Sequence, residues 1–522
     1  MPCLEAGFRP WDVRMPMTSR KKRVVVVTIT AGIGVLPFVA APAALAAVVS
    51  DSTAHGTSWL GSATAGTPTT LKQVRTVIGA DTGTAASLTG KGVGVALIDT
   101  GVAPVDGLPA AQIVNGPDLS LESQAPNLRY LDTFGHGTHM AGIIVGRDPS
   151  TGTVGLAPGA KLTSIKVGTA NGTVDVSQVI AAVDWVVQHR TDDPANPIKI
   201  INLSYGSGGT PDTWNDPLAF AVEKAWKSGI VVVAAAGNDG NGAGTMANPA
   251  SDEWIVSVGA AATNGTTTSA DDALTSFTNL PKAGKQINLL APGMSILSLR
   301  DPGSSIDNTY PAARVGDTLF RGTGTSQAAA VTSAAVALLL QAKPSATPTQ
   351  IKEWLAQSAT YIPNGPAATL GLKEINVNAA LARSSVAVAP KTWNNSTGIG
   401  TLDSARGDSR VMFDNVPLTG QRSVWGPLST ATWVAKATCG TAWAGGTWMG
   451  YRLAGDNWTG TSWASKTWAP AAWSNSKPWS STSATWTDPA WTGRSWAGRS
   501  WSAGAWSGRS WASDDWSSAS WK

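Results

Sequence analysis

The sequence predicts a three-layer, doubly wound α/β domain with a mainly parallel sheet, followed by a low-complexity C-terminal tail. Between residues 70 and 385, short β-branched runs alternate with longer stretches of helical periodicity. Most of the short runs are largely apolar, as strands covered on both faces are. Beyond residue 385 the composition shifts to Ser, Thr, Gly, Ala and Trp, and 18 of the 25 tryptophans lie there.

The predicted elements alternate along the chain. Apolar spacing predicts a helix over residues 176–190, and Asp216-Pro217 and Thr347-Pro348 begin two more, with a further helix from near Ser326 to Ala342. Such alternation gives a parallel sheet whose functional residues follow the carboxyl ends of strands. The predicted strands are residues 93–98, 162–167, 198–203, 230–235, 255–258 and 287–290.

The N-terminus predicts export. Residues 20–23 are basic, residues 24–39 are apolar, and residues 44–46 read Ala-Leu-Ala, the small-residue pattern of a cleavage site. We therefore assign residues 1–46 to a signal peptide and residues 47–69 to a short polar pro-segment or linker, which makes the protein secreted and extracellular. The alternative is an uncleaved membrane anchor, which two prolines in or beside the apolar run disfavour.

Composition argues against several classes of function. A formal net charge of +4 over 522 residues, with no basic run interleaved with aromatics after the N-terminus, predicts no nucleic-acid partner. No CxxC or HExxH motif occurs, so we expect no metal site in the chemistry and no required cofactor. We expect a monomer.

Asp99 follows the apolar residues 95–98 and so lies where a buried strand ends. A carboxylate there can orient an imidazole, although an ordinary turn aspartate is equally compatible with the motif. Residues 99–101 also read Asp-Thr-Gly, as in aspartic peptidases, with a second copy at residues 81–83. Only 18 positions separate Asp81 from Asp99, whereas that class takes its carboxylates from two lobes or subunits.

Any histidine general base is one of four residues. His55 lies just after the predicted signal, and His189 ends a predicted helix, where a cation is ordinary. This leaves residues 135–142 (GHGTHMAG), where small residues surround a helix start, and His136 is the candidate base. His136 and His139 have a spacing that could serve a metal, but no third ligand is evident, and His139 is interpreted as structural.

The candidate nucleophile is Ser326 in residues 322–330 (GTGTSQAAA), directly before a helix of small residues. Free N–H groups and the positive end of the helix dipole favour developing negative charge there. A simple serine N-cap is the alternative. No G-x-S-x-G elbow surrounds Ser326, which disfavours an α/β-hydrolase.

Asn238 follows the predicted strand 230–235 within residues 236–240 (AGNDG). Its side-chain amide is a candidate oxyanion donor, although a turn asparagine needs no function.

In combination these segments resemble the subtilisin-like serine peptidases. The resemblance covers residues 70–385 and rests on the order Asp99, His136, Ser326, with Asn238 between base and nucleophile. The motifs that carry it are residues 96–102 (ALIDTGV), 136–142 (HGTHMAG), 235–238 (AAGN) and 324–329 (GTSQAA).

The resemblance implies a secreted serine endopeptidase acting on protein or peptide substrates through an acyl-enzyme. It also implies that Ser204, Tyr205 and Gly206, at the end of the predicted strand 198–203, bind the substrate as an added β-strand. Structural calcium is common among relatives, but no ligand run here identifies a site. A catalytically silent relative is the other reading, against which the intact triad argues.

The sequence also departs from the family pattern. Gln327 and Ala330 stand where many relatives have Met and Pro, and Tyr205 where many have Leu. Residues 47–69 are too few for the large propeptide common in the family.

We divide the remainder into a linker, residues 386–432, and a Trp-rich pentad-repeat tail, residues 433–522. From Trp486 to Trp521 the tryptophans recur every five residues, a period of neither helix nor strand. A low-complexity tail that does not fold alone is the simplest interpretation. The alternative is a cell-surface binding protein in which the tail, bound to wall polymers, glycans or lipid headgroups, carries the main role.

Overall fold

The computed structural model describes residues 67–124, 128–208, 213–281, 287–407, 410–413, 416–444, 447–452, 495–496 and 499–500. The predicted signal peptide, all but the last three residues of the predicted pro-segment, and most of the Trp-rich tail lie outside the described residues.

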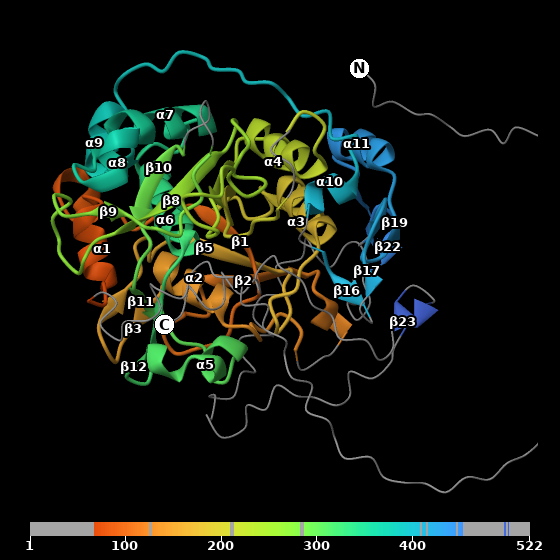
Figure 1. The fold of residues 1–522 in the computed structure, drawn as a ribbon, viewed down its shortest axis with the longest axis horizontal. Helices are drawn as coiled ribbons and strands as arrows, with labels where there is room; N and C mark the ends of the chain where they lie inside the picture. Colours follow the sequence, from red (N-terminus) through yellow and green to blue (C-terminus); the bar gives the residue numbers. More distant parts are fainter. Residues whose placement is uncertain are drawn as a thin grey trace, which may run out of the picture. The chain divides into compact units, whose positions relative to one another are not determined.

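Within the described residues, a ten-stranded sheet forms the centre of the fold (Figure 1). Every pairing from β2 across to β15 is parallel, and only β14 and β9 pair antiparallel. The order across the sheet is β14 (Thr360–Tyr361), β15 (Lys373–Glu374), β10 (Leu289–Pro292), β8 (Val256–Ala262), β7 (Val231–Ala235), β6 (Ile198–Leu203), β1 (Gly94–Asp99), β5 (Lys161–Lys166) and β2 (Ile113–Asp118), with β9 (Ala273–Leu274) on β8.

Helices cover the sheet and complete the predicted three layers. The helices α2 (His136–Val145) and α6 (Thr325–Ala342) pack on each other and on the sheet, and α3 (Val176–His189) and α4 (Pro217–Lys227) form a second such pair. Of the residues that the structure describes, only α6 has the length and hydropathy of a membrane-spanning helix, and it is buried in the interior. The predicted fold class is confirmed.

The other elements of the core lie around these layers. Two small antiparallel sheets flank the main one, formed by β3 with β4 and by β11, β13 and β12. Their bounds are β3 (Arg147–Asp148), β4 (Thr153–Val154), β11 (Ile296–Leu299), β12 (Arg314–Val315) and β13 (Leu319–Gly322). The remaining core helices are α1 (Leu71–Val77), α5 (Ser305–Thr309), α7 (Pro348–Ser358), α8 (Gly365–Leu370) and α9 (Val377–Arg383), with 3-10 turns at Gly83–Ser87, Leu121–Gln124 and Pro311–Ala313.

The predicted strands correspond to β1, β5, β6, β7, β8 and β10. The largest difference is at β8, which continues to Ala262, whereas the prediction stops at residue 258. Residues 259–262 are Gly and Ala and carry no β-branched signal, but pairing with β10 holds them extended. At Gly259 the absence of a side chain is required, because a Cβ would lie 2.7 Å from Leu290 Cδ2.

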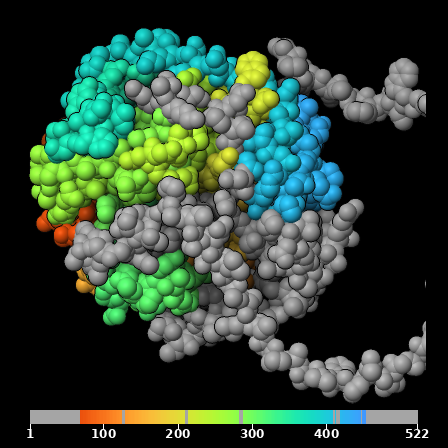
Figure 2. Space-filling view, viewed as in Figure 1, coloured from red at the N-terminus to blue at the C-terminus, as the bar shows by residue number. Residues whose placement is uncertain are grey.

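Residues 394–452, which we call the C-terminal extension, contain helices and short strands packed against α3 and α4. In the ribbon they are the blue elements beside these helices, and their blue surface borders yellow surface in the space-filling view (Figures 1 and 2). These residues include most of the predicted linker and the start of the predicted tail. The elements are α10 (Leu402–Arg406), β16 (Met412–Phe413), β17 (Val416–Pro417), β18 (Arg422–Ser423), β19 (Gly426–Pro427), α11 (Thr430–Thr438), β20 (Trp443–Ala444), β21 (Thr447–Trp448) and β22 (Tyr451–Arg452).

The spacing of five between Trp443 and Trp448 has a structural explanation. The two residues lie directly opposite each other in the antiparallel pair β20–β21. In this register residues five positions apart face one another across the two strands, which neither a lone strand nor a helix provides. Farther along the chain, β23 (Ser495–Trp496) and β24 (Arg499–Ser500) also pair antiparallel.

Asp184, on α3, anchors the extension. The indole Nε1–H groups of Trp433 and Trp448 donate to its Oδ2 at 2.7 and 2.9 Å, and both tryptophans are fully buried. Burial raises the pKa of Asp184 to about 6, although the two indole donors oppose the shift.

Folding stability is therefore expected to depend on the charge of Asp184. Since its pKa in the folded chain exceeds the ordinary value of 3.8, the folded chain binds this proton more tightly than the unfolded chain does. Protonation of Asp184 therefore adds about 3 kcal/mol to the free energy of unfolding for a pKa shift of this size. This stabilisation is fully present below about pH 4 and is lost as the pH rises through 6. Thermal unfolding of the wild-type protein and Asp184→Asn should show the wild-type Tm falling relative to the variant between pH 4 and 7. A constant difference would contradict the prediction, and the exposed Asp317→Asn is the control.

Candidate active site

The candidate residues lie at the carboxyl edge of the sheet or at adjacent helix starts. Asp99 is the last residue of β1, Ser204 directly follows β6, and Asn238 follows β7 by three positions. His136 is the first residue of α2, and Ser326 is the second residue of α6. α2 packs against α6, and His139 Nε2 from the first turns of α2 and Gln327 Nε2 from the first turn of α6 both lie within 2.6 Å of where a Cβ on Gly322 would lie, so the two helix starts are close together.

Asp99 and His136 form a buried pair. The Nδ1 atom of His136 lies 2.8 Å from Asp99 Oδ1 and 3.1 Å from Oδ2, and the two side chains are 3% and 1% exposed. Burial raises the pKa of Asp99, while its interaction with His136 and the backbone N–H of Thr100 lowers it. This arrangement orients the imidazole and stabilises it when it carries a second proton.

Asp132, which the sequence did not single out, supports this pair. Its Oδ2 accepts from both the backbone N–H and the hydroxyl of Thr138, and its Oδ1 accepts from the Thr100 hydroxyl and the N–H groups of Phe134 and Gly135. Five donors around one buried carboxylate fix the first turn of α2, where His136 stands. The available signal was an aspartate four residues before the histidine.

Ser326 does not cap its helix. The N-cap of α6 is Gly324, so the interpretation of Ser326 as an N-cap is wrong. The Ser326 hydroxyl lies 3.4 Å from the carbonyl oxygen of Ser204, to which it donates. The side chain is 1% exposed and lies in the first turn of α6, whose leading N–H groups have no partner within the helix.

Asn238 is held with its amide N–H group unused. Its Oδ1 accepts from the backbone N–H and the hydroxyl of Thr325 at 2.9 and 3.0 Å. Its Nδ2 is buried and has no hydrogen-bond partner among the residues that the structure describes. Gly237 makes this turn possible, with φ at 109° and Asn279 Nδ2 only 2.6 Å from where a Cβ would lie. The arrangement presents a fixed donor next to Ser326.

Two segments flank Asp99 because β6 and β5 are the neighbours of β1. The β6 wall, residues 204–207, contains the predicted Ser204, Tyr205 and Gly206. The Ser204 hydroxyl donates to the backbone carbonyl of Ser326 at 3.2 Å, and the side chain of Tyr205 is fully buried.

The β5 wall, residues 167–174, lies on the other side. The N–H groups of Val167 and Gly168 donate to the carbonyl of Asp99 at 2.8 and 3.4 Å. This segment could not be predicted from the sequence, because the neighbours of β1 are set by sheet order and not by chain order.

His139, three positions after His136 in α2, is fully buried. Burial, together with the charge of His136, lowers the pKa of His139 to about 3, so the ring is neutral, which agrees with its structural interpretation. The described residues contain no group of three His, Cys, Asp or Glu side chains suited to a metal ion.

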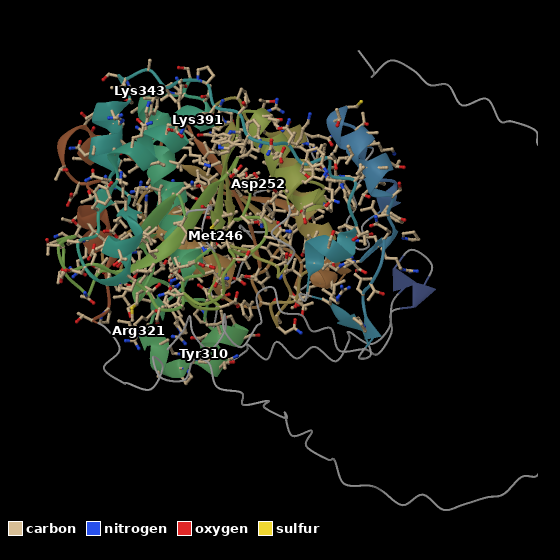
Figure 3. All side chains as sticks on the ribbon, turned by 45° about the horizontal axis from the view of Figure 1, so that its top comes forward. Met246, Asp252, Tyr310, Arg321, Lys343 and Lys391 are labelled. Atoms are coloured by element: carbon tan, nitrogen blue, oxygen red, sulfur yellow. The ribbon has the colours of Figure 1, made fainter. Side chains whose placement is uncertain are left out.

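A cavity of about 300 Å³ lies elsewhere, where α7 meets the start of β8. Figure 3 labels three of its lining residues, Met246, Asp252 and Lys391. Lys352, another lining residue, donates to the carbonyls of Glu253 and Ile255, and burial lowers its pKa to about 8. None of the predicted site residues lines this cavity.

Comparisons with known proteins agree with the motifs. The model of the subtilase family matches residues 90–400. Serine protease AprX of Bacillus subtilis is 39% identical over 276 residues, which cover 52% of this chain and 61% of AprX, so the chain spans about three fifths of that relative. Subtilisin DY of Bacillus licheniformis is 32% identical over 308 residues, 58% of this chain and 96% of that protein. A cold-adapted subtilisin-like serine proteinase of known structure is 29% identical, covering 56% of this chain and 90% of its own, with a TM-score of 0.42.

Proposed function

Since this chain belongs to the subtilase family, we propose that it is a serine endopeptidase whose nucleophile is Ser326 and whose general base is His136. The observation that carries the proposal is the buried Asp99–His136 pair at 2.8 Å, with α2 packed against the helix that begins beside Ser326. Protein or peptide chains are the proposed substrates.

The proposed chemistry has two halves. Ser326 Oγ attacks the carbonyl carbon of the scissile bond while His136 Nε2 takes the hydroxyl proton, and Asp99 stabilises the imidazolium through Nδ1. The proton then passes to the leaving amine, the C–N bond breaks, and an acyl-enzyme remains. Water hydrolyses the acyl-enzyme by the same proton transfers in reverse order, so no cofactor or metal takes part.

The oxyanion of each tetrahedral intermediate is proposed to bind Asn238 Nδ2 and a backbone N–H at the start of α6. The support is that Nδ2 is oriented through two bonds to Oδ1 yet has no partner among the described residues. A donor fixed in advance stabilises developing charge without reorganisation.

The substrate is proposed to lie extended between the β6 wall and the β5 wall, above Asp99. Backbone pairing of a peptide with such edges gives affinity that is independent of its side chains. The two walls follow parallel strands on either side of β1, where ligands of open α/β sheets bind.

Secretion is proposed from the basic, apolar and Ala-Leu-Ala segments of residues 20–46. We further propose that the enzyme is monomeric and that the tryptophans beyond residue 452 associate with a wall or cell surface, since regularly spaced indoles are costly to leave in water.

The proposal is tested by labelling the full chain with a fluorophosphonate probe. The wild-type protein should take up close to one equivalent, with the label on the peptide that contains Ser326, and Ser326→Ala should take up none. Equal labelling of both proteins would remove Ser326 as the nucleophile.

A further inference from the structure

The one-turn helix α10 in the C-terminal extension contacts both sides of the candidate groove. The carbonyl of Ala405 accepts from the hydroxyl of Ser207, at the end of the β6 wall, at 2.6 Å. The next residue, Arg406, binds Asp175, which directly follows the β5 wall, through Nε–Oδ2 at 2.5 Å and Nη2–Oδ1 at 3.2 Å. Two consecutive residues of α10 thus reach two segments separated by more than thirty positions.

The Arg406–Asp175 connection is rigid. Both side chains are completely buried, and the two hydrogen bonds form the paired geometry that arginine and carboxylate prefer. The remaining Arg406 donors go to Asp403 and to the backbone carbonyls of Gly420 and Arg422. Because all of its N–H donors are hydrogen-bonded, the Arg406 guanidinium is held in one position.

Asp175 connects the fixed Arg406 side chain to the end of the β5 wall. It is the N-cap of α3, where it accepts from the backbone N–H and the hydroxyl of Ser177. A second residue of the extension, Val424, donates its N–H to the same Ser177 hydroxyl. The β5 wall is therefore fixed at one end by the Asp99 carbonyl and at the other by the extension.

The β6 wall is fixed in a corresponding way. Ser207 exchanges backbone hydrogen bonds with Asn248, and the Asn248 side chain also donates to the Ala405 carbonyl, at 3.4 Å. Through Ala405 and Arg406, α10 joins the far ends of both walls.

We propose that α10 is a tie that sets the separation of the two groove walls, with Arg406 as a positioning residue for extended substrates. This inference rests on the proposed function, because the walls matter only if a peptide lies between them. A long peptide uses both walls, whereas a single amino-acid ester needs only the triad and the oxyanion donors.

The experiment must separate this role from simple stability. Arg406→Met alone leaves a buried carboxylate unpaired, which destabilises the fold whatever the walls do. The double variant Arg406→Met with Asp175→Ser removes the charge together with its partner, and serine still caps α3. Ser207→Ala removes the hydroxyl that joins the β6 wall to Ala405. Arg383→Met, which removes a partly exposed arginine bonded to Gln357, is the matched control.

Each full-length variant is assayed with a long internally quenched peptide and with N-acetyl-phenylalanine ethyl ester, and its Tm is measured. For the double variant we expect KM for the peptide to rise at least about tenfold, with kcat for the ester within about threefold of wild type. Ser207→Ala should raise KM for the peptide by about threefold or more. Arg383→Met should leave kcat and KM unchanged for both substrates.

If the double variant folds and its KM for the peptide is unchanged, the proposal that α10 is a tie is wrong. If the double variant does not fold, an unchanged peptide KM in Ser207→Ala contradicts the proposal in the same way. An equal loss on peptide and ester also overturns it, because a general disturbance of the site would explain both. A wild-type protein that takes up no fluorophosphonate would instead overturn the proposed function.

Discussion

Replacing His136 with alanine is expected to lower kcat for peptide hydrolysis by roughly 10⁶-fold, with KM nearly unchanged. This magnitude is that of the triad of subtilisin, a relative of this chain. The physical reason is that Ser326 is not ionised at neutral pH and attacks only if its proton is removed in the same step. The measurement is kcat and KM with a quenched peptide at pH 8.

The matched control is His189→Ala. His189 lies at the surface, 2.8 Å from Asp192, and stacks on Trp185 far from the candidate triad in sequence. It should keep activity within about twofold of wild type, the range of an ordinary surface substitution. If His136→Ala kept more than about a hundredth of wild-type kcat, the general base would lie elsewhere.

Replacing Asn238 with alanine is expected to lower kcat by about 10² to 10³-fold while KM changes little. The range is that of the corresponding oxyanion donor of subtilisin, a relative of this chain. Nδ2 has no partner among the described residues, so its removal breaks no hydrogen bond there, whereas the loss of Oδ1 leaves the N–H and hydroxyl of Thr325 without this acceptor. The fall in kcat is therefore expected from the missing oxyanion donor, and a lower Tm from the lost Thr325 contacts.

Asn238→Asp sharpens this test. The carboxylate keeps two acceptors for the N–H and hydroxyl of Thr325 but replaces the amide donor with negative charge, so kcat should fall further than in the alanine variant. The surface substitution Asn364→Ala, which loses only an exposed bond to Ala270, is the control. A rise in KM with kcat unchanged would assign Asn238 to substrate binding instead.

Most of the sheet could be predicted because its strands carry a local signal. The segments around β1, β5 and β6 are apolar and β-branched, and strands buried on both faces need that composition. The end of β8 could not be predicted, since its Gly and Ala residues are extended only through pairing with β10. The strand β2 was missed for a related reason, because residues 113–118 contain Asn, Gly and Pro and take their conformation from β5.

The candidate site could be predicted where a residue type is scarce or a motif is local. His136 followed from elimination among four histidines, and Asp99 and Asn238 from their places after strands. Asp132 and the β5 wall were missed because their roles depend on which elements become neighbours.

The C-terminal extension shows the same limit most clearly. Its composition resembles the tail that follows, yet Arg406 and Trp433 are buried against α3. The composition of a segment indicates whether it can form a hydrophobic core by itself. The C-terminal extension instead packs against the surface of a core that the preceding residues form, so its composition does not predict that it folds.

By itself, the sequence determined the α/β class, the order of the six predicted strands along the chain and the candidate roles of Asp99, His136, Ser326 and Asn238, because each depends on local periodicity or on a local motif. Only the tertiary structure decided that β5 and β6 flank β1, that Asn238 is held by Thr325, and that α10 joins the two walls. These facts depend on contacts between residues far apart in the chain, and no local pattern of residues encodes such contacts.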